Sequence, residues 1–336
     1  MKQSLLAFCW CAATISACVA DTGVNHSPAR QPVAQTHTRE VDVEIPVTKR
    51  HQGGGQRALQ FAVMGDRTGS FRPGVFEGAI EQLNYLQPDY VFSVGDLIEG
   101  YTDDLGEIEA QWDEFDRLAD QLSIPFFYTV GNHDISNETM QRTWRARYGK
   151  TYYSVVIDDV LFLVLNTEDP AVEMPPAMLA RIQSFESRFR EDPETMQARV
   201  LEAMRNRPEA AKLPGEVAIS DRQIEWARRT VKAYDEVRWT FVLMHKPAWA
   251  YDSNEFAEIE AALGDRPYTV IAGHEHYYDH ERRKNRDYIT MGTTGGVWLK
   301  DGPGRIDHML WVTMTDEKPV IASMPLFDPS LPSTEN

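Results

Sequence analysis

Side chains that can bind metal ions follow five apolar runs of the 336-residue sequence. The five segments are Gly65-Asp66-Arg67-Thr68, Gly95-Asp96, Gly131-Asn132-His133-Asp134, His245 and Gly273-His274-Glu275-His276. In open α/β sheets, ligands bind in the crevice outside the carboxyl ends of the strands, so we expect these side chains to meet there. Aspartate, asparagine and histidine without cysteine suit Zn²⁺, Mn²⁺ or iron rather than copper or an iron–sulfur cluster. The pattern therefore predicts a metal site.

The same residue types suit the hydrolysis of a phosphate ester. A carboxylate such as Asp96 can bridge two ions, and two ions a few ångströms apart favour in-line attack on phosphorus. The ions lower the pKa of a bound water, and a nearby imidazole can protonate the leaving oxygen. Taken alone, Asp96 could equally be a helix N-cap. The placement of all these residues at successive strand ends favours the site.

The elements that carry these residues alternate between strands and helices. We predict strands over 58–64, 89–94 and 124–130, with helices over 73–86 and 107–122. This β-α-β-α-β order predicts a largely parallel sheet with right-handed crossovers. A hairpin over 152–166 is expected next, turning at Asp158-Asp159, and the later strands are expected over 239–244, 267–272, 287–291, 308–315 and 319–324.

A charged, helical insertion is predicted over residues 175–214. After it, Ser220 has the properties of a helix N-cap, with Gln223 three residues later completing a capping box. No internal repeat is visible along the chain. These features predict one domain over 58–327, preceded by a polar tether over 21–57 and followed by a tail over 328–336.

The composition limits the classes of partner. The chain has 51 acidic and 34 basic side chains, a net charge of −17, and 42% apolar residues. Such a balance argues against a protein that binds nucleic acid or anionic lipid through a broad basic surface. We therefore expect a small phosphate-ester substrate and no nucleic acid. Composition leaves the oligomeric state open.

Residues 1–20 are typical of an export signal, with Lys2 before a short apolar stretch over 5–15. Ser16-Ala17-Cys18 resembles a bacterial lipobox, which would make Cys18 a lipid anchor; ordinary cleavage after Ala20 is the alternative. A third interpretation is an apolar helix packed on the core. We expect a periplasmic or outer-membrane-anchored lipoprotein, or a secreted protein. All three cysteines lie in this segment, so the remaining chain has no disulfide.

The ordered series of motifs resembles the calcineurin-like metallophosphoesterases, which include purple acid phosphatases and many phosphodiesterases. The resemblance covers residues 59–276. It implies an α/β fold, a four-layer α/β/β/α sandwich of two mixed sheets. It also implies an enzyme that hydrolyses a phosphoric ester with two divalent metal ions (Mn, Fe or Zn), in which a metal-bound hydroxide attacks phosphorus.

The resemblance also implies six metal ligands, with Asp96 as the bridge between the two ions. The others are Asn132, His245 and His274 for one ion, and Asp66 and His276 for the other. His133 would protonate the leaving group or orient the phosphate, and Asp134 would hold its ring. Arg67 could face the substrate as a phosphate clamp, or it could be a solvated loop cation.

One departure from the family pattern concerns the first metal. A histidine usually stands two residues after the first aspartate, and Thr68 occupies that place here. Glu99 stands where purple acid phosphatases have a tyrosine. Water, Thr68 or Glu99 would have to complete this site, so we expect it to bind its ion weakly. Two alternatives follow: a one-metal phosphodiesterase, or a non-catalytic binding or scaffold lipoprotein with a degraded metal site.

Overall fold

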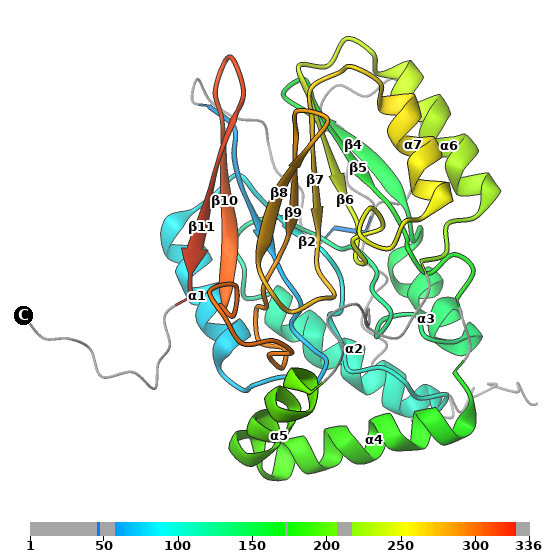
Figure 1. The fold of residues 1–336 in the computed structure, drawn as a ribbon, viewed down its shortest axis with the longest axis vertical. Helices are drawn as coiled ribbons and strands as arrows, with labels where there is room; N and C mark the ends of the chain where they lie inside the picture. The colour runs from blue at the N-terminus through cyan, green and yellow to red at the C-terminus, as the bar shows by residue number, and fades with distance from the viewer. Residues whose placement is uncertain (1–45, 48–57, 172–173, 207–216, 327–336) are drawn as a thin grey trace, which may run out of the picture.

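The structure is a computed structural model that describes residues 46–47, 58–171, 174–206 and 217–326. The predicted export signal with Cys18, almost all of the tether, the end of the helical insertion and the tail lie outside the described residues. Two β-sheets pack face to face between outer helices (Figure 1). The predicted four-layer sandwich is confirmed.

The first sheet combines parallel and antiparallel strands. Its order is β11 (Pro319–Pro325), β10 (His308–Met314), β1 (Gln60–Met64), β2 (Tyr90–Ser93) and β3 (Phe126–Phe127). Strands β1, β2 and β3 are parallel, and β10 and β11 are antiparallel to their neighbours. The third strand is shorter than predicted, because after Phe127 the Thr129 N–H donates to the Ser93 hydroxyl at 3.0 Å rather than to a backbone carbonyl of β2.

The second sheet contains the remaining strands and is also mixed. Its order is β4 (Tyr153–Ile157), β5 (Val160–Val164), β6 (Trp239–Leu243), β7 (Tyr268–Ala272), β9 (Arg286–Thr290) and β8 (Asp279–Arg283). The predicted hairpin is present, with Asp158 and Asp159 at φ 56° and 58°. Two successive positive φ angles are the geometry of a type I′ turn, which matches the twist of paired strands.

Aromatic side chains fill the space between the two sheets. Phe61 of β1 lies 5.0 Å from both Phe162 of β5 and Phe241 of β6, measured between ring centroids. Phe92 of β2 stacks on Phe162 at 4.3 Å. All four rings are fully buried. Because side chains alternate along a strand, Ala62 and the other residues of opposite orientation face the outer helices.

The outer helices form the two remaining layers and an insertion. The layers consist of α1 (Val75–Leu86), α2 (Leu105–Ala119) and α3 (Glu138–Tyr148) over the first sheet, and of α6 (Asp221–Ala233) and α7 (Asn254–Leu263) over the second. The predicted insertion forms α4 (Pro176–Glu191) and α5 (Pro193–Arg205), at the bottom of Figure 1. Ser220 caps α6 by accepting the Gln223 N–H at 3.3 Å, as predicted.

Three elements were not predicted from the sequence. Helix α3 contains few apolar residues, although Met140, Trp144 and Tyr148 follow a helical spacing and are buried. Helix α7 is short and begins directly after the loop that carries His245. Strand β8 lies at the edge of its sheet and is largely exposed and charged, so it has no apolar pattern to detect.

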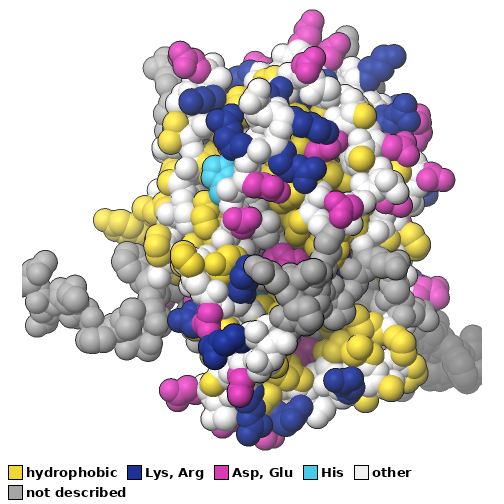
Figure 2. Space-filling view, viewed as in Figure 1, with side chains coloured by type: hydrophobic (Ala, Val, Ile, Leu, Met, Phe, Trp, Pro, Cys, Tyr) yellow, Lys and Arg dark blue, Asp and Glu magenta, His cyan; other side chains and the backbone are white. Residues whose placement is uncertain are grey.

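None of the helices in the described residues is both long and apolar enough to span a bilayer. On the face shown in Figure 2, acidic and basic side chains of the described residues are interspersed.

His308 links the loop after β9 to the first sheet through a neutral ring. Its Nε2 accepts the Gly292 N–H at 2.8 Å, and its Nδ1 donates to the Ser323 hydroxyl at 2.7 Å. A protonated ring has no lone pair for the first bond. Burial accordingly lowers the pKa of His308 from 6.5 to about 4.

The lowered pKa of His308 predicts acid sensitivity. Between pH 6.5 and about 4 the unfolded chain binds a proton that the folded protein excludes, so the free energy of unfolding decreases as pH falls. The resulting decrease in the free energy of unfolding amounts to about 3 kcal/mol. We expect His308→Gln, measured by urea unfolding at pH 7 and pH 4, to lose less stability than the wild type over this interval. Exposed His280→Gln is the control. An equal loss in all three proteins would contradict the assignment.

Candidate metal centre

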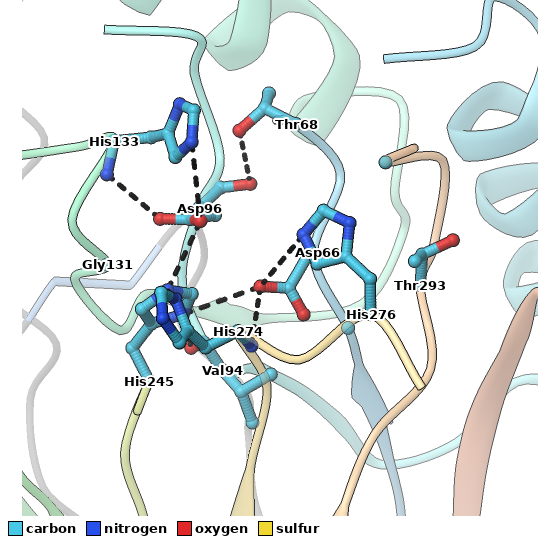
Figure 3. A network of polar contacts seen from close by, with 12 residues as sticks. Asp66, Thr68, Val94, Asp96, Gly131, His133, His245, His274, His276 and Thr293 are labelled. Atoms are coloured by element: carbon cyan, nitrogen blue, oxygen red, sulfur yellow. Dashed lines mark hydrogen bonds and ion pairs between the residues drawn. The ribbon is translucent and has the colours of Figure 1, made fainter. Parts of the chain in front are cut away.

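Loops at the carboxyl ends of five strands meet between the two sheets (Figure 3). Asp66 follows β1, and Asp96 follows β2. The segment that contains Asn132 follows β3, His245 follows β6, and the segment with His274 and His276 follows β7. The first sheet therefore contributes the oxygen ligands and the second sheet the imidazoles. The convergence expected from the sequence is observed for all six residues.

The ligand atoms form two groups that share one carboxylate. Asp96, His245 and His274 form one group, and Asp66, Asp96 and His276 form the other, with all atoms of a group within 4.8 Å of one another. In the first group the His245 Nε2 lies 3.2 Å from Asp96 Oδ2 and 3.2 Å from His274 Nδ1. The Asp96 carboxylate is thus placed to bridge two ions.

Asn132 belongs to the first group through its side-chain amide. Its Oδ1 lies 2.9 Å from His245 Nε2, and its Nδ2 donates to the Tyr101 hydroxyl at 2.8 Å. The amide nitrogen thus faces Tyr101 and the amide oxygen faces the imidazole. The amide oxygen is therefore the atom that Asn132 offers to an ion.

Backbone carbonyls orient two of the imidazole rings. His245 Nδ1 lies 3.0 Å from the Val94 carbonyl, and His276 Nδ1 bonds the Val297 carbonyl. A ring that donates from Nδ1 presents the lone pair of Nε2, and such contacts to the second nitrogen are usual for metal-binding histidines. Both rings are therefore prepared to bind an ion through Nε2.

Two buried polar atoms at the site have no hydrogen-bond partner. They are Asp66 Oδ2 and His274 Nε2. An unsatisfied buried polar group costs about 1–3 kcal/mol, and more when it is charged. Asp66 and His274 belong to the two groups, so each retains a buried polar atom that hydrogen bonds within the protein do not use. The residues present therefore fit the metals that the motif series implies.

The charges at the site are strongly coupled. Burial disfavours the Asp96 carboxylate, but the neighbouring His245 and His133 rings outweigh burial and hold its pKa far below the usual range. Burial also opposes protonation of His245, yet the Asp96 and Asp66 charges raise its pKa to about 9. For His274, burial and the His245 charge lower the pKa. The buried carboxylates thus favour positive charge between them.

Glycines let the loops approach the bridging carboxylate closely. A Cβ atom at Gly131 would lie 2.1 Å from Asp96 Oδ1, and one at Gly273 would lie 2.5 Å from Asp66 Oδ2. Asp96 itself has a φ of 55°, and His274 has a φ of 71°. Left-handed backbone at non-glycine residues is costly and occurs mainly at functional sites. The backbone is therefore strained where the ligands converge.

Asp134 does not hold the His133 ring, contrary to the expectation from the family. Its carboxylate accepts four backbone N–H groups, from Asp96, Leu97, Ile98 and Gly131, at 2.8–3.1 Å. The His133 ring is held instead by the Glu99 carbonyl, 2.6 Å from Nδ1. Asp134 thus shapes the loop that carries Asp96, and the backbone after β2 positions His133.

Arg67 is not placed as a phosphate clamp, nor is it a solvated cation. The side chain is buried, and its guanidinium donates to the Leu97 carbonyl at 2.9 Å and to both Glu114 carboxylate oxygens at 2.7 and 2.9 Å. It also lies 5.0 Å from the centre of the Phe71 ring. Arg67 therefore connects the loop after β1 to helix α2.

Thr68 and Glu99 are also held by backbone groups. The Thr68 hydroxyl lies 2.8 Å from the Ile98 carbonyl and 3.0 Å from that of Asp96. The Glu99 carboxylate accepts the N–H groups of Ser70 and Phe71 at 3.0 and 2.8 Å. Among the described residues, the group around Asp66 therefore has three acidic or histidine ligands.

Comparison with known proteins assigns the family. The sequence profile of calcineurin-like phosphoesterases matches residues 51–278, a range that contains all six candidate ligands. The chain belongs to the calcineurin-like phosphoesterase family. The prediction of a metallophosphoesterase is thus confirmed at the level of the family.

Among curated proteins, the phosphoesterase chain is 37% identical over 103 residues to human serine/threonine-protein phosphatase CPPED1. The aligned segment covers 27% of this chain and 31% of that protein, so the chain matches about a third of its relative's length.

Solved structures share the phosphoesterase fold at low sequence identity. A dimetal phosphatase from Danio rerio is 12% identical, with a TM-score of 0.55 over 81% of this chain and 98% of that one. The purple acid phosphatase PPD1 from yellow lupin is 12% identical, with a TM-score of 0.54 over 83% of this chain and 53% of that one. These similarities confirm the architecture.

The shared carboxylate predicts the effect of one substitution. Asp96→Asn should remove most of both metal ions, because it takes a charged ligand from each group while asparagine tolerates the left-handed backbone. Bound Mn²⁺ per chain, counted by plasma mass spectrometry after gel filtration, should fall from about two to near zero. Exposed Asp103→Asn should match the wild type. Full retention of metal in Asp96→Asn would contradict the bridging assignment.

Proposed function

We propose that this protein is an exported, metal-dependent hydrolase of small phosphate esters that uses two divalent ions. One observation carries the proposal: two groups of potential metal ligands share the Asp96 carboxylate. The chain belongs to a family of phosphoesterases, in which such an arrangement suits hydrolysis. When bound, such ions polarise the ester and lower the pKa of a coordinated water. The donor set of carboxylate, amide and imidazole suits Mn²⁺, iron or Zn²⁺.

His133 is the protein group placed to assist the leaving oxygen. Its Nε2 lies 3.9 Å from Asp96 Oδ2, and its Nδ1 donates to the Glu99 carbonyl. Burial opposes protonation of the ring, but the charges of Asp96 and Glu99 raise its pKa above 6.5. A protonated ring beside the metal groups can donate its proton to the departing alcohol.

The substrate is proposed to be a small phosphomonoester. CPPED1, which shares a segment with this chain, is named as a protein phosphatase, and that name favours monoesters over diesters. The net charge of −17 disfavours polynucleotides, whose phosphates would be repelled by the protein as a whole.

A one-metal phosphodiesterase is the second candidate, because the Thr68 hydroxyl contacts backbone carbonyls where a histidine ligand is usual. The metal count distinguishes the two candidates, with about two ions per chain for the first and about one for the second.

Hydrolysis of p-nitrophenyl phosphate and of its bis ester tests the function. We expect the wild type to be active with Mn²⁺, iron or Zn²⁺ and inactive after chelation. His133→Ala should lower kcat by about 10²–10⁴-fold with an unchanged metal count, because it removes the proton donor and no metal ligand. His280→Ala, at an exposed histidine, should keep full activity.

One result would contradict this function, and another would contradict the role of His133. Wild-type protein that binds metal but hydrolyses neither ester would favour the non-catalytic scaffold. Loss of metal from His133→Ala would make His133 a ligand and remove it as the proton donor.

Export and anchoring through Cys18 are proposed from the sequence alone. The support is the lipobox-like Ser16-Ala17-Cys18 after a short apolar stretch. Cys18→Ser should move the full-length protein from the membrane to the soluble fraction when it is expressed in a bacterium with a lipoprotein pathway. A chain that stays soluble in both forms would favour ordinary cleavage, and membrane association of both would exclude the lipid anchor.

A further inference from the structure

The helical insertion places a buried carboxyl group beside the leaving-group imidazole. Glu186 belongs to α4, and only 7% of its surface is exposed. Atoms of Glu99, His133 and Glu186 lie within 4.8 Å of one another. Gln183 holds helix α4 against the loop after β2, which also carries Glu99, because its Nε2 donates to the Tyr101 carbonyl at 3.0 Å. The insertion therefore places Glu186 beside His133, next to the candidate metal centre.

One oxygen of the Glu186 carboxyl group has no hydrogen-bond partner. Its Oε1 is buried and accepts no hydrogen bond. Within the described chain, no ion pair within 4.0 Å joins His133 to Glu99 or to Glu186. Burial, together with the charge of Glu99, raises the pKa of Glu186 to about 8. A buried, unpaired carboxyl beside another carboxylate is unfavourable unless a cation or hydrogen-bond donor lies between them.

The position of Glu99 and Glu186 relative to the metal groups indicates what these two side chains could bind. His133 is close to both groups of carboxylates: its Nε2 lies 3.9 Å from Asp96 Oδ2, and a ring nitrogen lies within 4.8 Å of carboxylate oxygens of Glu99 and Glu186. If the phosphate of a substrate lies at the metal groups and its ester oxygen faces His133, the far end of the alcohol comes close to Glu99 and Glu186. Two carboxylates can balance both an imidazolium and a second positive charge.

We propose that Glu186 and Glu99 bind a positively charged group on the alcohol part of the substrate, so that the preferred substrates are phosphate esters of amino alcohols. This inference rests on the proposed phosphoesterase function. An ammonium group would donate hydrogen bonds to both carboxylates and supply the partner that Glu186 Oε1 lacks. Esters with acidic alcohol parts would be repelled by the same two groups.

The test measures binding, so it does not require turnover. The probes are aminopropylphosphonate and butylphosphonate, which differ by an ammonium in place of a methyl and resist hydrolysis. Calorimetry with the full-length, Mn²⁺-loaded protein should give a Kd that is about 10- to 100-fold lower for the amine, since a hydrogen bond to a charged group is worth about 1.5–3 kcal/mol.

Matched variants of α4 locate the interaction. Glu186→Gln keeps the shape of the side chain and removes the carboxyl group that would ionise beside the ammonium, so it should reduce the preference for the amine to about threefold or less. Glu191→Gln makes the same change at an exposed residue of the same helix and should keep the wild-type preference. The metal count of both variants is measured in parallel.

Three outcomes would overturn the inference. The first is equal binding of the two phosphonates to the wild type, and the second is an unchanged preference in Glu186→Gln. The third is the loss of one metal equivalent in Glu186→Gln, which would make Glu186 a metal ligand. A preference for the amine in a protein that hydrolyses no ester would support the cation site and reject the hydrolase, so the two proposals fail separately.

Discussion

The buried carboxylate of Asp96 is the interaction on which the site depends. It accepts the His133 N–H at 3.0 Å and lies 3.2 Å from His245 Nε2, so it connects the loops after β2, β3 and β6. Its own backbone is fixed by Asp134, which also holds Gly131. Because the charge is removed from water, it must be balanced locally, by the neighbouring imidazoles or by a bound cation.

The two halves of the site come from different sheets, so the packing between the sheets sets its geometry. Asp66 and Asp96 follow strands of the first sheet, and His245 and His274 follow strands of the second. Phe61, which contacts the second sheet, lies on strand β1, and Asp66 follows that strand directly. Metal–ligand distances vary by only about 0.2 Å, and a rigid aromatic core can maintain such tolerances.

The sequence predicts most of the fold and the convergence of all six candidate ligands, because strand ends and glycines can be recognised locally. Side-chain roles are harder to predict, since they depend on contacts between distant segments. Arg67 precedes its partner Glu114 by 47 residues, and Asp134 bonds the backbone of a loop 36–38 residues earlier. No sequence spacing predicts that Glu186 lies near His133, because the position at which an inserted helix packs against the site cannot be recognised from local sequence. Only burial and its unpaired oxygen reveal it.

Thr68 stands where the family usually has a histidine, and its hydroxyl helps to hold the loop after β1. The backbone N–H groups of Arg67 and Thr68 both donate to the Asp96 carbonyl at 3.1 Å, and the Thr68 hydroxyl lies 3.0 Å from the same atom. A histidine would bind an ion but could not make this short hydroxyl contact. The group around Asp66 thus offers fewer ligands to an ion, while the loop that carries Asp96 is held more firmly. Catalytic metal sites need open coordination positions, so this change is compatible with an active enzyme.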